Sequence, residues 1–535
     1  MSLAPSAHVD TFTRDNLPPM DQWPSLIFTL PELQYPERLN CATALLDDTV
    51  AAYGADRPCL LTPDGDRWTY GDLLRRANQV ARYLTTDVGL VPGNRVLLRA
   101  PNNPWLVACW FGVLKMGGVV VTTMPLLRTS ELQAIHEIAR IDHSIVDHRF
   151  LDDLAAADIG AYTVFGDGSA DSLEVRSAIH PTDFSNVDTS NDDVALLAFT
   201  SGTTGRPKAT MHFHRDVLAN ADTFSRHVLR PRSDDLFTGS PPLGFTFGLG
   251  GLVVFPMHAG AATLLLEKGT PDVLLPALAA HRPTVLFTAP TAYRALLNAG
   301  GDFSSLRRCV SAGEPLPKST WQAWYEATGV KIIDGIGSTE MLHIFISAAD
   351  DEIRPGATGK PVPGYEACVL SDSGEPVKDG EIGRLAVRGP TGCRYLADER
   401  QTVYVQNGWN LTGDTYVRDE AGYYWYQARN DDMIISAGFN IAGPEVEMAL
   451  LRHPDVLECG VVGAPDPERT MSVVAYVVLR PGVAGTPEKA EELRAFTRTV
   501  IAPYKAPRSI EFLPALPRTS TGKVQRFVLR EMASG

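Results

Sequence analysis

Four hydroxyl side chains, two glycines and a lysine gather within the nine residues Thr200–Lys208, which read TSGTTGRPK. Glycines let backbone N–H groups approach an anion closely, hydroxyl groups donate hydrogen bonds, and the lysine adds positive charge. Because the segment follows an expected strand at Val194–Phe199, its composition is typical of a loop that binds a polyphosphate. It is not a Walker A loop, since Arg206 and Pro207 separate the second glycine from the lysine. An ordinary Ser/Thr/Gly turn is the alternative interpretation.

Three later segments also combine residue types that suit phosphate chemistry. Ile336–Glu340 (IGSTE) presents a hydroxyl beside a carboxylate, which suits a Mg²⁺–phosphate complex. Leu411–Asp414 (LTGD) places a carboxylate after a glycine, where it could accept both hydroxyl groups of a ribose. Pro517–Lys523 (PRTSTGK) is a polar loop that ends in one of only ten lysines in the chain. Each segment alone is more often a solvated turn, so the prediction depends on their occurring together.

The composition describes an ordinary globular protein with an acidic balance. The chain has 535 residues, a formal net charge of −15 and a hydrophobic content of 44%. A chain this acidic is not expected to bind nucleic acid or an anionic membrane through its overall charge. The seven cysteines are scattered and include no C-x-x-C pair, which argues against a disulfide framework or a zinc site.

The order of expected elements indicates a large α/β domain followed by a smaller α+β domain. Helical and β-branched stretches alternate over the first 430 residues, while residues 431–535 hold 12 Lys/Arg against 13 Asp/Glu, so the excess acidity lies in the first part. We therefore place the boundary between residues 1–430 and 431–535. The elements expected are helices at Tyr70–Leu84, Asn103–Met116, Asp216–Leu229, Gly443 onward and Pro487–Val500, and strands at Asn94–Arg99, Val119–Thr123, Val194–Phe199, Pro283–Phe287, Asp431–Ser436 and Ser472–Leu479.

In this order the four segments resemble the adenylate-forming superfamily, which includes acyl- and aryl-CoA synthetases, adenylation domains of peptide synthetases, and luciferases. The resemblance spans essentially the whole chain and includes Leu114–Arg128 (LKMGGVVVTTMPLLR) and Ser311–Pro317 (SAGEPLP). It implies the fold of that superfamily, with a large N-terminal adenylation domain and a small mobile C-terminal domain. It also implies ATP, Mg²⁺ and coenzyme A as cofactors and co-substrates.

The resemblance assigns a role to individual residues of this sequence. Lys523, Glu340 and Thr339 are expected to be catalytic, and Glu340 is the expected metal ligand. Asp431 is the expected hinge, about which the C-terminal domain turns between two half-reactions. The expected ATP-binding residues are Thr200, Ser201, Gly202, Thr203, Thr204, Gly205, Lys208, Gly313, Glu314, Pro315, Asp334, Gly335, Ile336, Gly337, Asp414 and Arg429, and the expected channel for coenzyme A contains Ala437, Gly438 and Phe439. One departure concerns adenine, because Ile336 stands where the family often has a tyrosine.

The acid pocket is expected at Phe245, Thr246, Phe247, Gly248 and His343. Peptide-synthetase domains usually have an Asp after the Phe of this segment, and its absence favours a CoA ligase. The runs GIGSTEMLHIF, VTTMPLLR and FNIAGPEVE resemble the benzoate and 2-aminobenzoate CoA ligase branch. The segment PPLGFTFGLGG is more similar to the 2-aminobenzoate side, which makes 2-aminobenzoate (anthranilate) the first choice of acid. His343 either contacts the substrate or is a packed, hydrogen-bonded histidine. His212 and His214 either touch phosphate or are structural.

The resulting prediction is an AMP-forming aryl-acid CoA ligase. Benzoate or a hydroxybenzoate is the alternative acid, and a carrier protein is the alternative acceptor, with a downstream acyl-transfer enzyme as a further partner. A Walker-type ATPase is disfavoured because its motif is missing, and a non-catalytic relative because Lys523 and Glu340 are retained; an oxygenation side activity stays open. The N-terminus has neither a basic nor an apolar signal region, so a cytoplasmic location is expected. The sequence does not indicate an oligomeric state.

Overall fold

The computed structural model describes residues 3–200, 207–429, 432–436, 439–466, 470–501, 503–518 and 524–534. The chain divides into two compact units. Unit 1 comprises residues 1–367 and 387–410, and unit 2 comprises residues 368–386 and 411–535. The mixed α/β architecture predicted from the sequence is confirmed. The boundary expected between residues 430 and 431 lies outside the described residues and stays a prediction.

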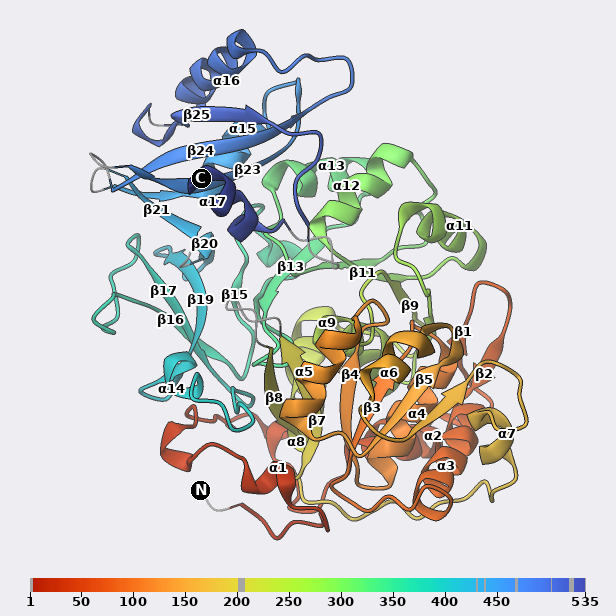
Figure 1. Cartoon of the computed structure of the whole chain (residues 1–535). Coiled ribbons are helices and arrows are strands. Elements are labelled where there is room, and N and C mark those ends of the chain that lie inside the picture. The colour runs from red at the N-terminus through yellow and green to blue at the C-terminus, as the bar shows by residue number, and fades with distance from the viewer. Residues whose placement is uncertain are drawn as a thin grey trace. The chain divides into compact units, whose positions relative to one another are not determined.

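One sheet of unit 1 has the order β6-β5-β3-β4-β7-β8 (Figure 1). Its strands are β3 (Arg95–Arg99), β4 (Val119–Thr123), β5 (His143–Asp147), β6 (Tyr162–Phe165), β7 (Val194–Thr200) and β8 (Lys208–Phe213). All neighbouring strands are parallel except β7 and β8. Side chains of α5 (Thr129–Ala139) and α6 (Leu151–Ala157) share a buried cluster with β3, β4 and β7. This arrangement fixes the ends of β7 and β8, between which the predicted phosphate loop lies.

The other large sheet of unit 1 has the order β15-β14-β13-β12-β11-β9-β10-β1-β2. Its strands are β1 (Pro58–Leu61), β2 (Arg67–Thr69), β9 (Leu236–Gly239), β10 (Ala262–Leu264), β11 (Val285–Thr288), β12 (Arg308–Ser311), β13 (Ile332–Gly337), β14 (Ile344–Ser347) and β15 (Lys360–Pro361). Helices α11 (Pro271–His281), α12 (Pro290–Ala299) and α13 (Lys318–Thr328) pack on it through a buried cluster. Because β12 and β13 are parallel neighbours, the predicted adenine segments that follow or end them lie at one edge.

The apolar stretch around Lys115 forms helix α4 (Pro104–Lys115), followed by β4. Asn103 caps the helix by accepting a hydrogen bond from the Leu106 backbone N–H at 2.9 Å. Pro104 occupies the first helical position, where its missing N–H removes no intrahelical hydrogen bond. Lys115 is fully buried, and its Nζ lies 2.6 Å from the Asp47 carboxylate. Among the described residues, no helix is both long and apolar enough to cross a bilayer.

Unit 2 contains a sheet in the order β22-β21-β24-β23, with β25 pairing β24. The strands are β21 (Met433–Ser436), β22 (Phe439–Ala442), β23 (Val456–Asp466), β24 (Thr470–Leu479) and β25 (Ser509–Phe512). Side chains alternate between the two faces of a strand. One face therefore packs against α15 (Gly443–Leu450) and α16 (Pro487–Val500), and the other packs against α17 (Arg526–Ser534).

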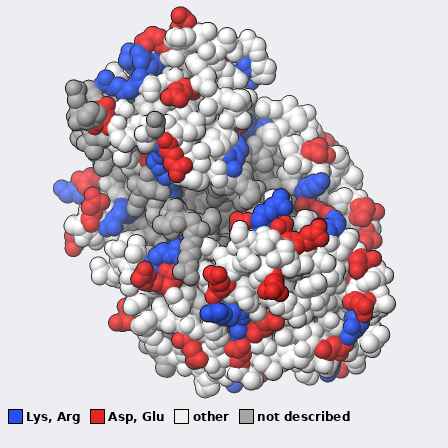
Figure 2. All heavy atoms as spheres, in the orientation of Figure 1, with Lys and Arg blue, Asp and Glu red and all other residues white. Residues whose placement is uncertain are grey.

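A further sheet is formed by β16 (Glu366–Leu370), β17 (Ile382–Arg388), β18 (Val405–Gln406), β19 (Trp409–Arg418) and β20 (Tyr424–Arg429). The boundary between the two units runs through β16, β17 and β19. On the face shown in Figure 2, acidic and basic side chains are interspersed over the described surface and do not gather into a basic patch.

Candidate functional site

The predicted phosphate loop connects the two strands of an antiparallel hairpin. β7 and β8 pair with Thr200 opposite Lys208, so the ends of the loop are held beside each other. The sequence predicted the first strand and a later helix but not β8, which precedes the helix α8 (His214–Asn220). The predicted contacts Ser201, Gly202, Thr203, Thr204 and Gly205 lie outside the described residues. Thr200 and Lys208 are both half-buried at the base of the loop.

A tight turn between β13 and β14 carries Thr339 and Glu340. The Leu342 backbone N–H donates to the Thr339 carbonyl at 3.1 Å, and Leu342 has a φ of 70°. A buried leucine in this left-handed region is strained by about 1–3 kcal/mol, a cost that surrounding contacts must offset. Such strain is typical of functional turns.

Two hydrogen bonds from side chains outside the turn fix the position of its backbone carbonyl groups. The His212 Nε2 donates to the Thr339 carbonyl at 2.8 Å, and the Thr391 hydroxyl donates to the Met341 carbonyl at 2.9 Å. Burial lowers the pKa of His212 to about 4, so the ring is neutral and its proton lies on Nε2. His212 thus has a structural role, which decides between the two alternatives left open by the sequence.

His214 is also structural. Its ring is fully buried, and its Nδ1 accepts a hydrogen bond from the Cys41 backbone N–H at 3.1 Å. Burial lowers the pKa of His214 to about 3, so the ring is uncharged and is unsuited to neutralising a phosphate.

Replacing Thr391 with Val is predicted to destabilise the turn. The Thr391 side chain is fully buried and its hydroxyl also lies 3.0 Å from the Tyr365 hydroxyl, so valine keeps the shape but removes one hydrogen bond from each of two buried polar groups. The expected loss in free energy of unfolding is about 1–3 kcal/mol, measured by urea denaturation. Thr86→Val, which removes an exposed helical hydroxyl, is the matched control and should change stability by less than about 0.5 kcal/mol. Equal stabilities of the two variants would contradict this role for Thr391.

Glu340 lies in a chain of polar contacts that the sequence did not predict. The Tyr395 hydroxyl donates to Glu340 Oε1 at 2.5 Å, and Lys208 Nζ donates to the Tyr395 hydroxyl at 2.8 Å. Lys208 Nζ itself is 3.9 Å from Glu340 Oε1. Burial, together with the Glu340 carboxylate, raises the pKa of Tyr395 far above its usual range, so the hydroxyl keeps its proton and remains a donor. Tyr395 belongs to none of the motifs found in the sequence, so only its contacts in the folded structure identify it.

The described side chains around Glu340 fit a magnesium ion. Glu340 is 7% exposed, and among the described residues its Oε1 accepts from Tyr395 while Oε2 has no hydrogen-bond partner. Mg²⁺ prefers a site with one or two carboxylates that is completed by phosphate oxygens and water. The available Oε2 and the neighbouring Thr339 hydroxyl match that donor set.

The predicted ribose contacts lie together in unit 2. Asp414 on β19 pairs with Arg429 on β20, and the Arg429 Nη1 is 3.2 Å from Asp414 Oδ1. Gly413 adopts a φ of 79°, which strongly favours glycine, and a β-carbon there would lie 3.2 Å from the Arg429 guanidinium. The LTGD segment therefore needs its glycine to place the carboxylate beside the arginine.

The predicted adenine segments lie at the ends of two paired strands. Ser311 of β12 pairs with Asp334 of β13, which brings the segment Gly313, Glu314, Pro315 close to the segment Asp334, Gly335, Ile336, Gly337. Burial raises the pKa of Asp334 to about 8, and its Oδ1 has no hydrogen-bond partner among the described residues. A carboxyl group in this state can present a proton to a heterocyclic nitrogen.

Two residues predicted for the acid pocket, Phe247 and His343, belong to an aromatic cage whose centre is the His343 ring itself. The ring centroid of His343 lies 5.6 Å from that of Phe247, 4.6 Å from Phe255, 5.4 Å from Phe224 and 6.5 Å from Phe287. Phe245, Thr246 and Gly248 belong to the same segment, at or within helix α9 (Thr246–Leu249).

Glycines allow this close packing. A β-carbon on Gly250 would lie 2.4 Å from His343 Cδ2, and one on Gly251 would lie 2.4 Å from Phe287 Cδ1. Both distances are shorter than carbon atoms tolerate, so the two rings occupy the space that the glycines leave. The run GLGG in the sequence is explained by this cage.

His343 is packed but not hydrogen-bonded. The side chain is 3% exposed, and neither ring nitrogen has a hydrogen-bond partner among the described residues. Burial lowers the pKa of His343 to about 3, so the ring is neutral and has one nitrogen that can accept and one that can donate. The Phe247 backbone nevertheless interacts with the ring, and the packed aromatic rings enclose it, so contact of His343 with a substrate stays a prediction.

Several predicted residues fall outside the described part of the chain. These are Lys523, the hinge Asp431, and Ala437 and Gly438 of the expected channel for coenzyme A. Phe439 begins β22, and only its backbone is described. Their roles stay predictions from the resemblance.

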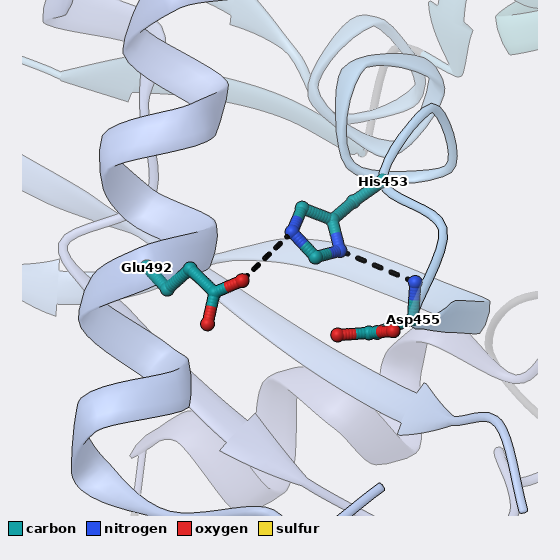
Figure 3. A group of neighbouring side chains, drawn as sticks. All are labelled: His453, Asp455 and Glu492. Atoms are coloured by element: carbon teal, nitrogen blue, oxygen red, sulfur yellow. Dashed lines mark hydrogen bonds and ion pairs between the residues drawn. The ribbon is translucent and has the colours of Figure 1, made fainter.

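A second group of potential metal ligands lies in unit 2. His453, Asp455 and Glu492 bring ligand atoms within 4.8 Å of one another (Figure 3). Lys489 Nζ, however, lies 2.8 Å from Asp455 Oδ2 and 2.6 Å from Glu492 Oε2, and the hydrogen bond to Asp455 raises the pKa of Lys489. Because an ammonium group already neutralises both carboxylates, this group is an ion-pair network between α16 and the loop before β23.

Comparison with known proteins places these features in a family. A family model for AMP-binding enzymes matches residues 46–395, and one for the AMP-binding enzyme C-terminal domain matches residues 445–523. The benzoate–CoA ligase of Thauera aromatica is 35% identical over 94% of this chain and 98% of its own. The crystal structure of an anthranilate CoA ligase with anthranoyl-AMP has a TM-score of 0.88 and 35% identity, covering 94% of this chain and 99% of that one. A benzoate CoA ligase from Burkholderia xenovorans has a TM-score of 0.85 and 32% identity, covering 92% and 100%.

Proposed function

Because the chain belongs to the AMP-binding enzyme family, we propose that it is an aryl-acid CoA ligase specific for anthranilate. This family is the adenylate-forming superfamily that the motifs indicated. The enzyme activates the acid with ATP to an acyl-adenylate and transfers the acyl group to coenzyme A, releasing AMP and pyrophosphate. ATP and coenzyme A are the substrates of such ligases, and Mg²⁺ is typical of the family.

The observation that carries the proposal is that one short turn bears both Glu340 and His343. Glu340 presents a carboxylate for the metal–phosphate complex, and three residues later His343 lies within the aromatic cage. Aromatic walls accept a flat ring and exclude bulky aliphatic chains. An acid bound beside the cage and a phosphate at Glu340 would therefore be brought together by the same element.

The first half-reaction needs positioning and charge stabilisation and no general base. A carboxylate is already anionic, so the enzyme has to bring it to the α-phosphorus and stabilise the charge that develops there. Lys208 and the loop 201–206 would hold the β- and γ-phosphates, Thr339 the α-phosphate, and Asp414 with Arg429 the ribose. A Mg²⁺ ion bound by Glu340 would supply additional neutralisation of phosphate charge.

The C-terminal residues complete the proposal through the resemblance. Lys523 would lie between the acid carboxylate and the α-phosphate during adenylation. A turn about Asp431 would then withdraw Lys523 and let Ala437, Gly438 and Phe439 line the channel for the thiol of coenzyme A.

The preference for anthranilate comes from the unpartnered nitrogen of His343. Its neutral ring can accept a hydrogen bond from the 2-amino group, which benzoate lacks. A net hydrogen bond contributes about 0.5–1.5 kcal/mol, so kcat/KM for anthranilate is predicted to exceed that for benzoate by up to about tenfold. The structural similarity to the anthranilate CoA ligase supports this preference, whereas the sequence similarity to benzoate–CoA ligase supports benzoate as the alternative acid.

The test is thioester formation with ATP, Mg²⁺ and coenzyme A and a panel of anthranilate, benzoate, 2-hydroxybenzoate, 4-hydroxybenzoate and octanoate. The aromatic acids should surpass octanoate, with anthranilate first. Octanoate used as well as the aromatic acids would overturn the aryl-acid proposal. Benzoate equal to anthranilate would overturn only the choice of acid. AMP formation without a CoA thioester would favour a carrier protein as the acceptor.

A further inference from the structure

The Tyr395 hydroxyl lies between Lys208, at the base of the predicted phosphate loop, and Glu340, in the turn between β13 and β14. The hydroxyl accepts from Lys208 Nζ at 2.8 Å and donates to Glu340 Oε1 at 2.5 Å. Lys208 Nζ and Glu340 Oε1 are 3.9 Å apart, an ion pair without a direct hydrogen bond, and a small rotation of the lysine side chain would bring the two groups into direct hydrogen bonding. The hydroxyl occupies the position through which that hydrogen bond would form.

The position of the hydroxyl is set by contacts away from the turn. Tyr395 is fully buried, and its backbone N–H donates to Gln401 Oε1 at 2.9 Å. Its backbone also forms a β-bridge to Thr210 of β8, and its ring meets that of Tyr404 edge-on at 5.8 Å. Lys208 Nζ lies 4.7 Å from the centre of the Tyr395 ring, so the ring also stabilises the ammonium group.

We propose that Tyr395 is a positioning residue for adenylation, which orients Glu340 and prevents Lys208 from hydrogen-bonding to it directly. A direct hydrogen bond between them would occupy the carboxylate and withdraw the lysine from phosphate. With the hydroxyl between them, Glu340 keeps Oε2 available for a metal ion and Lys208 keeps its charge available for phosphate. This inference rests on the proposed function, because it gives Glu340 its role as metal ligand.

The test measures metal binding directly. Free Mn²⁺ is followed by electron paramagnetic resonance in titrations of the full chain in the presence of α,β-methylene-ATP. This analogue cannot transfer its adenylyl group to an acid. Tyr395→Phe keeps the ring and removes the hydroxyl. Because a hydrogen bond to a charged group is stronger than a neutral one, the affinity for Mn²⁺ is expected to fall about 10–100-fold. The KM for the aryl acid should stay within about twofold.

Tyr83→Phe is the matched control. Tyr83 is a buried tyrosine whose hydroxyl bonds with Thr163 at 3.1 Å, and it has no described contact with Lys208 or Glu340. This variant should bind Mn²⁺ as the wild type does. Melting temperatures of both variants show whether each is folded, and equal Mn²⁺ affinities of Tyr395→Phe and the wild type would overturn the proposal.

A double-mutant cycle separates positioning from a general structural effect. In a Glu340→Gln background the metal carboxylate is gone, so adding Tyr395→Phe should cause little further loss of Mn²⁺ affinity. The same fold-loss in both backgrounds would show that Tyr395 does not act through Glu340 and would overturn the inference. Failure of the proposed function is recognised separately, because the wild type would then form no AMP with any aryl acid.

Discussion

Replacing Lys523 with Ala is expected to lower the rate of adenylation by at least about 10²–10³-fold, the usual loss when one preorganised group that stabilises the transition state is removed. By the resemblance, Lys523 neutralises the approach of the acid carboxylate to the α-phosphate, an interaction that strengthens as charge develops. Adenylation is measured as acid-dependent exchange of pyrophosphate into ATP. Thioester formation from synthetic anthraniloyl-AMP is measured on the same preparation and should survive, because Lys523 has left the site by then.

Lys489→Ala provides the control for loss of a lysine from the same unit. Lys489 on α16 pairs with Asp455 and Glu492 and has no described contact with a residue assigned to the site, so exchange should stay within about twofold. A Lys523 variant that loses both half-reactions equally would contradict the rotation of the C-terminal domain. One that loses neither would remove Lys523 from the mechanism.

Replacing Glu340 with Gln is expected to reduce adenylation by about 10²–10³-fold at any Mg²⁺ concentration. The amide keeps the size of the side chain, and its oxygen can still accept the Tyr395 hydroxyl, so the turn should fold. It cannot provide the negative charge that a divalent cation prefers. The measurement is pyrophosphate exchange across a Mg²⁺ titration.

Glu267→Gln tests whether any loss of a carboxylate has this effect. Glu267 forms a half-exposed ion pair with Arg149, and this variant should exchange pyrophosphate at nearly the wild-type rate. Wild-type exchange by Glu340→Gln, or full recovery at high Mg²⁺, would show that Glu340 is not the metal ligand.

Helices and strands that are buried along their whole length were predicted well from the sequence. β4 has the bounds expected for it, and α4 runs from Pro104 to Lys115 within the expected Asn103–Met116. Local signals are sufficient here, because the cap, the first-position proline and the continuous apolar stretch all agree. β8 was missed because its sequence, KATMHF, contains a lysine and a histidine and becomes a strand through pairing with β7.

The candidate site was predictable only where a motif carries it. Thr339, Glu340 and Asp414 were assigned from short segments and Arg429 from the family resemblance, and the structure pairs Asp414 with Arg429. Tyr395 was not found because it lies 55 residues from Glu340 in the sequence, and its contact with Glu340 depends on tertiary structure. The unsatisfied nitrogens of His343 were equally beyond prediction, because they depend on rings supplied by separate helices and strands.

The compact units and the change in composition describe different properties of the chain. The charge balance and the pattern of expected helices and strands change near residue 431, whereas residues 368–386 and 411–429 already belong to unit 2. Compactness reflects which strands pair in the folded chain, and a change in composition does not report pairing. The hinge at Asp431 therefore remains to be tested by function.

Attack of the acid carboxylate on the α-phosphorus of ATP can be followed directly by isotope transfer. The enzyme is supplied with anthranilate labelled with ¹⁸O in both carboxylate oxygens, together with ATP, Mg²⁺ and coenzyme A, and the nucleotide product is analysed by mass spectrometry. One labelled oxygen should appear in AMP for each thioester formed, because the oxygen that bridges carbon and phosphorus leaves with AMP. Unlabelled AMP, or ADP accompanied by labelled inorganic phosphate, would contradict this mechanism.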